Sequence, residues 1–120
     1  MSMSSFLPVV LMAALESGTI RCNLEALSKE ERALHGRMTR AIAVSVREQV
    51  ELPRGFRWRF VPGETSPALL VEWIGHERRC CPFLRFQVEF EPEGGAIWLT
   101  LTGPEGAKEI LREAFARRGK

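Results

Sequence analysis

Two runs of alternating apolar and polar residues flank a turn in LRFQVEFEPEGGAIWLTLT, residues 84–102. The apolar positions are Leu84, Phe86, Val88 and Phe90 in the first run and Ile97, Leu99 and Leu101 in the second. Such alternation is typical of strands that have one face on a core and the other in water. Because Pro92-Glu93-Gly94-Gly95 favours a turn between the runs, we predict that the two strands pair as a hairpin.

A helix is predicted immediately before this hairpin. Ser66 is a favourable N-cap, and Pro67 is favourable at the first helical position. The core-facing stripe consists of Leu69, Leu70, Trp73 and Ile74. Pro82 disfavours a helical residue before it, so the helix should end near Arg79 or Cys80.

A longer helix is predicted to begin after Ser28, which forms a capping-box spacing with Glu31. Apolar residues then recur every four positions, at Leu34, Met38, Ile42 and Val46. This period predicts a helix that continues to about Val50 and is ended by residues 53–55.

The predicted order of elements is strand, helix, strand, helix, strand, strand, helix. The first strand is residues 19–23, the second is residues 56–60, and the last helix begins at residues 103–105. Helices on one face of such a sheet give an α+β two-layer sandwich, a variant of the ferredoxin-like arrangement. We expect a single domain over residues 19–120, preceded by an N-terminal arm, residues 1–18.

Composition excludes several classes of protein. The chain has 120 residues, a net charge of +2, 45% hydrophobic residues and 27% charged residues, as in ordinary soluble globular proteins. Arginines are interleaved with glutamates, which favours a mixed-charge surface and no nucleic-acid partner. The apolar run at residues 6–15 is too short for a membrane span, which needs about 20 residues. We expect this run to pack on the domain or on a second copy, so a homo-oligomer would form through residues 6–15 or the open sheet face.

The cysteines are few and unevenly placed. Cys80 and Cys81 are adjacent at the predicted junction of helix and strand, and Cys22 is the third. Three cysteines without a repeated spacing do not make a disulfide framework, and adjacent cysteines rarely bond each other. We therefore expect thiols in a reducing, cytoplasmic location.

Glu77 continues the buried stripe of the predicted helix, where a carboxylate must be paired, protonated or bound to something. It lies three positions before Cys80 and four before Cys81, so these groups can face one pocket. His76 lies on the neighbouring flank, and Cys22 would approach from below if its strand were central in the sheet. The alternative is that Glu77 pairs with an arginine and the cysteines are small buried apolar residues.

Metal binding suits this arrangement better than covalent catalysis. The helix C-terminus near Cys80 disfavours a thiolate, and no histidine is clearly placed as a general base. His35, on the flank of the long helix, is expected to be structural. A metal deprotonates its own thiols. We therefore predict Cys22, Cys80 and Cys81 as ligands of Hg(II), As(III) or Cu(I), with Glu77 and His76 beside them. If His76 became a fourth ligand, the site would suit zinc.

The segment ERRCCPFLRF, residues 77–86, resembles the Glu-x-x-Cys-Cys-x-Phe-Leu-x-Phe motif of a family of small, uncharacterised bacterial proteins. Cys22-Asn23-Leu24 and residues 99–107 are similar to the same family. Relatives occur alone or alongside mercury-resistance and heavy-metal transport components. The resemblance covers residues 20–117 and implies that Glu77 and the three cysteines carry the function.

Two functions are therefore carried forward. The first is a small cytoplasmic protein that binds a soft metal or metalloid through cysteine thiolates, in heavy-metal resistance or trafficking. The second is a non-enzymatic interaction module in which the cysteines are core packing. Its contact surface would be the apolar arm or the open sheet face that carries Arg57, Arg59, Arg85 and Trp98. A thiol-dependent enzyme is the third alternative, and it lacks a recognisable base.

Overall fold

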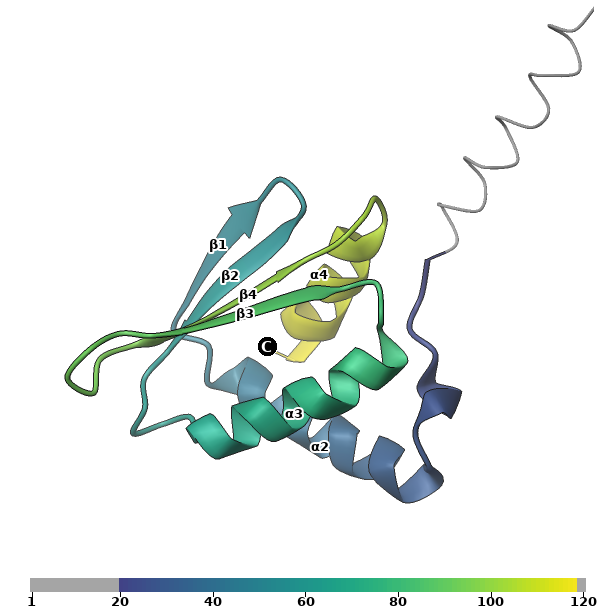
Figure 1. Ribbon diagram of the computed structural model, residues 1–120, viewed down its shortest axis with the longest axis horizontal. Coiled ribbons are helices and arrows are strands. Elements are labelled where there is room, and N and C mark those ends of the chain that lie inside the picture. Colours follow the sequence, from purple (N-terminus) through teal and green to yellow (C-terminus); the bar gives the residue numbers. More distant parts are fainter. Residues whose placement is uncertain (1–19, 119–120) are drawn as a thin grey trace, which may run out of the picture.

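The computed structural model describes residues 20–118 (Figure 1). The predicted arm, residues 1–18, lies outside these residues, as does the contact predicted through residues 6–15. Within the described residues the chain forms a short 3₁₀ helix, three α-helices and four strands. In chain order these are η1 (Leu24–Ala26), α2 (Lys29–Val44), β1 (Glu48–Leu52), β2 (Gly55–Phe60), α3 (Pro67–Cys80), β3 (Arg85–Phe90), β4 (Ile97–Thr102) and α4 (Ala107–Arg118).

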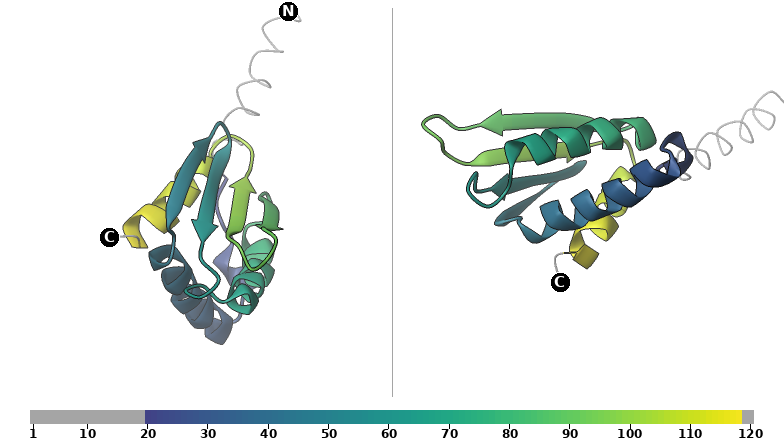
Figure 2. Two further views of the ribbon diagram at one scale, coloured as in Figure 1. Left: turned by 90° about the vertical axis from the view of Figure 1, so that its left-hand side faces the viewer. Right: turned by 90° about the horizontal axis from the view of Figure 1, so that it is seen from below.

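The strands form one antiparallel sheet in the order β1-β2-β4-β3, and the α-helices lie on one side of it (Figure 2). The predicted α+β class is confirmed. The predicted hairpin is confirmed as well, because β3 pairs with β4 from Arg85 opposite Thr102 to Phe90 opposite Ile97. The helix-facing side chains of the two central strands form the core and are Phe56, Trp58, Phe60, Ile97, Leu99 and Leu101.

Helix α3 is also confirmed, with the bounds that the sequence predicts. The Ser66 side chain accepts a hydrogen bond of 3.2 Å from the Leu69 N–H, which satisfies one backbone donor that the first turn leaves unpaired. The buried residues of the helix are Leu70, Trp73, Glu77 and Cys80. The buried face of α3 therefore carries a carboxylate and a thiol at its C-terminal end.

The prediction of a helix up to Val50 is wrong. Helix α2 ends at Val44, and the following residues form β1, which pairs with β2 in a hairpin. Val46 continues the four-residue spacing of α2, but Val50 and Leu52 alternate with polar residues, which is the period of a strand. The helical period and the strand period overlap at these valines, and the sheet provides the partner that decides between them.

The strand predicted for residues 19–23 is absent from residues 20–23, and η1 follows directly. The Asn23 N–H donates a hydrogen bond of 2.6 Å to the Cys80 carbonyl, so this segment lies beside the C-terminus of α3 instead of in the sheet. The observed order after η1 is helix, strand, strand, helix, strand, strand, helix. The predicted order, and with it the ferredoxin-like arrangement, is not confirmed.

Candidate functional site

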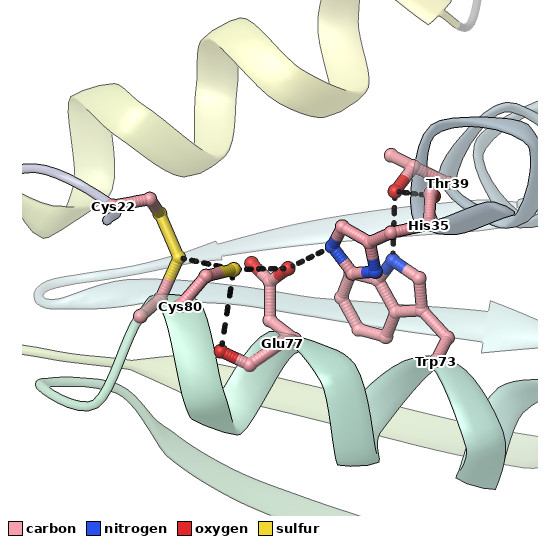
Figure 3. The surroundings of a disulfide bond; sticks show 7 residues. Cys22, His35, Thr39, Trp73, Glu77 and Cys80 are labelled. Atoms are coloured by element: carbon pink, nitrogen blue, oxygen red, sulfur yellow. Dashed lines mark hydrogen bonds and ion pairs between the residues drawn. A yellow bond between two sulfur atoms is a disulfide. The ribbon is translucent and has the colours of Figure 1, made fainter. Parts of the chain in front are cut away.

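Cys22 and Cys81 form a disulfide, and Cys80 is a free, buried thiol (Figure 3). The expectation of thiols at Cys22 and Cys81 is therefore wrong for this state of the protein. The Cα atoms of the bonded pair are 4.6 Å apart, within the usual range for a disulfide. Cys22 reaches this position along the C-terminus of α3, and not from below as it would from a central strand of the sheet.

Cys80 lies between the disulfide and the carboxylate of Glu77. Its Sγ atom is 3.6 Å from Cys81 Sγ and 3.9 Å from Glu77 Oε1, and it lies 3.7 Å from the Glu77 carbonyl oxygen. Burial raises the pKa of the Cys80 thiol to about 12, and the neighbouring Glu77 carboxylate acts in the same direction. Cys80 is therefore a protonated thiol in this state and a poor nucleophile.

The partner of Glu77 is His35 and not an arginine. Glu77 Oε1 and His35 Nε2 are 2.7 Å apart, and both side chains are buried. The His35 ring stacks on Trp73 at 5.8 Å between centroids, and the Trp73 indole donates to the Thr39 hydroxyl at 2.8 Å. These contacts from α2 and α3 hold the Glu77 carboxylate next to the Cys80 thiol (Figure 3).

His35 belongs to the site but was not among the site residues predicted from the sequence. Its spacing in the sequence nevertheless indicates that it is buried. His35 lies three positions before Met38 and seven before Ile42, so it belongs to the buried stripe of α2. Its Nδ1 atom is buried without a hydrogen-bond partner among the described residues, which is uncommon for a buried polar group. A histidine on an apolar stripe needs a polar partner, and here Glu77 of the neighbouring helix provides it.

Two groups of side chains have donor atoms within 4.8 Å of one another, as a metal ion requires. One group is Cys22, Cys80 and Cys81, and the other is His35, Glu77 and Cys80. His76, predicted beside the ligands, belongs to neither group. It packs edge-on against His35, with 5.8 Å between ring centroids.

A cavity of about 270 Å³ adjoins these groups. Its wall includes Cys22 and Cys80 but not Cys81, together with Glu77 and His35. Residues of α4 line it as well, which the sequence alone did not indicate. The sulfur atoms of Cys22 and Cys80 and the carboxylate of Glu77 thus face a space that can hold a ligand larger than a single ion.

Comparisons of the chain with protein-family models, curated proteins and solved structures give no significant match. Within residues 20–118, no helix has both the length and the apolar character that crossing a membrane requires.

Proposed function

We propose that this protein binds a soft metal or metalloid ion through the thiolates of Cys22, Cys80 and Cys81 once the Cys22–Cys81 disulfide is reduced. The observation that carries the proposal is the convergence of three sulfur atoms within 4.8 Å. Three sulfurs bound in a plane at about 2.3 Å from a metal lie about 4.0 Å from one another. Cys80 Sγ already lies at nearly this spacing, 3.6 Å from Cys81 Sγ, and opening the disulfide would let the Cys22 and Cys81 sulfurs separate to it.

Reduction precedes binding in this account. Two molecules of a small cellular thiol would be oxidised to their disulfide while Cys22 and Cys81 become thiols. A reducing cytoplasm would supply such thiols, so a cytoplasmic location is part of the proposal.

Non-covalent contacts keep Cys22 near the other two cysteines when the disulfide opens. The Asn23 N–H donates to the Cys80 carbonyl at 2.6 Å, and the Arg79 guanidinium donates to the Ala26 carbonyl at 2.9 Å. Leu27, at the end of the same segment, is only 2% exposed. These contacts favour a reduced state in which the three thiols stay together.

Trivalent arsenic and Hg(II) suit the reduced cluster. Arsenous acid, As(OH)₃, reacts with three thiols to give three As–S bonds and three water molecules, without a change in oxidation state. Hg(II) and Cu(I) displace the thiol protons to the solvent, and metal binding of this kind overcomes even a raised thiol pKa. Soft ions prefer such thiolates, whereas zinc would need a fourth donor. Glu77, with Oε1 3.9 Å from Cys80 Sγ, is placed to be that donor, and His76 belongs to neither group of converging donor atoms.

The resemblance to bacterial proteins near mercury-resistance components supports the same proposal, and we place the protein in heavy-metal resistance or trafficking. Glu77, held by His35, would lie beside the bound ion.

The second candidate is a non-enzymatic interaction module, favoured by the burial of Cys80 and Cys81 at 1% and 0% exposure. In that case the disulfide is a structural cross-link. The contact surface would be the outer face of the sheet, where the Arg57 guanidinium lies 3.7 Å from the centre of the Trp98 ring.

Calorimetric titration of the reduced protein with arsenite, in an excess of a monothiol competitor, separates the two candidates. The metal site predicts one bound arsenic per chain and a large loss of affinity in Cys22→Ser, Cys80→Ser and Cys81→Ser alike. Equal affinity in all three variants and the wild type would favour the interaction module.

A further inference from the structure

The cavity beside the thiols has two chemically different walls. The segment before α2 contributes Cys22, and α3 contributes Glu77 and Cys80. Helix α4, the pale yellow helix in Figure 3, lies across from these side chains. Its contribution to the lining is apolar and consists of Ile110, Leu111 and Ala114. A ligand in the cavity would therefore meet sulfur and a carboxylate on one side and hydrocarbon on the other.

The volume of the cavity is larger than a single ion needs. An ion bound by three sulfurs lies among the sulfur atoms and uses little of the 270 Å³. A cavity of about 150 Å³ lined by apolar side chains is enough to hold benzene. The space next to the thiols therefore accommodates a metal or metalloid together with a ring-sized organic group.

The arginine at the cavity already has a hydrogen-bond partner. Arg32 belongs to the lining, and its guanidinium donates to the Leu27 carbonyl at 3.1 Å. It helps to hold the segment that carries Cys22. The α4 side of the cavity thus favours an uncharged, apolar group over an acidic one.

We propose that the natural ligands of this site are organo-substituted thiophiles, in particular trivalent arsenicals that carry one aryl or alkyl group. This inference rests on the proposed thiol site and names its ligand class. Cys22 and Cys80, the two thiols that line the cavity, bind the arsenic, and the organic group lies against α4. With phenylarsine oxide, the arsenic–oxygen bonds break, two As–S bonds form, and the oxygen leaves as water with the two thiol protons. The As–C bond and the oxidation state are unchanged.

A cavity-filling variant tests this assignment. Ala114→Phe places a ring where the organic group would lie, and Ala41→Phe makes the same change at an exposed position of α2. Both are reduced and titrated with phenylarsine oxide and with arsenite in an excess of monothiol. We expect Ala114→Phe to weaken phenylarsine oxide binding by about tenfold or more and Ala41→Phe by less than about twofold, with arsenite binding little changed in either.

Nuclear Overhauser effects in the wild-type complex provide a second readout if Ala114→Phe does not fold. Ring protons of bound phenylarsine oxide should show effects to the methyl groups of Ile110 and Leu111. A wild-type complex without these effects, or unchanged phenylarsine oxide affinity in folded Ala114→Phe, overturns the inference and leaves the thiol site standing. Failure of both arsenicals to bind the reduced wild type would instead reject the proposed function itself.

Discussion

Reduction of the Cys22–Cys81 disulfide should lower the stability of the fold by a calculable amount. The bonded cysteines are separated by 59 positions, so the cross-link restricts a loop of that length in the unfolded chain. Chain-entropy theory assigns about 4 kcal/mol to the closure of such a loop at 25 °C. A domain of ordinary stability, about 5–15 kcal/mol, would stay folded after this loss. The thiol cluster would then be assembled in a protein that is less stable but still native.

Urea unfolding of the oxidised and reduced wild type measures this difference. Cys22→Ser serves as the control, because its stability should match that of the reduced wild type and should not respond to a reductant. Cys80→Ser keeps the disulfide and should respond as the wild type does. A change of less than about 1 kcal/mol on reduction would refute the reasoning, because a cross-link of this loop length that forms in solution restricts the unfolded chain by more than that.

Three further predictions concern the surroundings of the site. Glu77→Ala should lower the free energy of unfolding by about 1–3 kcal/mol, because it leaves His35 buried without a partner, and Glu77→Gln by less; equal values by urea unfolding would contradict this. With a pKa of about 12 against an ordinary value near 9, Cys80 should be alkylated about a thousandfold more slowly in the folded than in the unfolded protein at pH 8, as measured by mass spectrometry. Hydrogen bonds from Arg79, and secondly from the Ser28 backbone, lower the pKa of Glu31 from 4.5 to about 2. The stability that this carboxylate contributes is therefore present above pH 4.5 and lost as the pH falls towards 2, and Arg79→Gln should flatten the profile of stability over that range.

The elements that were predicted correctly carry their own local signals. The hairpin of β3 and β4 has alternating residues and a turn rich in glycine, and α3 has an N-cap, a proline at its first position and a proline after its end. The placement of Glu77 on the buried stripe of α3 follows from the same period. Local periodicity therefore located the two residues, Glu77 and Cys80, around which the site is built.

The features that were mispredicted depend on contacts with residues outside the mispredicted segments. Val46 and Val50 fit a helical and a strand period equally well, and only pairing with β2 decides that residues 48–52 are a strand. Cys22 bonds Cys81 because its segment passes beside the C-terminus of α3, a path set by hydrogen bonds such as that from Asn23 to Cys80. No pattern within residues 19–23 encodes that path.

Native mass spectrometry of the reduced protein with arsenite, in an excess of a monothiol, tests the central claim most directly. Three-thiol binding predicts a single adduct with the mass of one arsenic atom less three hydrogen atoms. The adduct should be absent from the oxidised protein and from the Cys80→Ser/Cys81→Ser variant. If the reduced wild type gives no adduct above the monothiol competitor, or gives one that the double variant retains, the cysteines are not a soft-metal site.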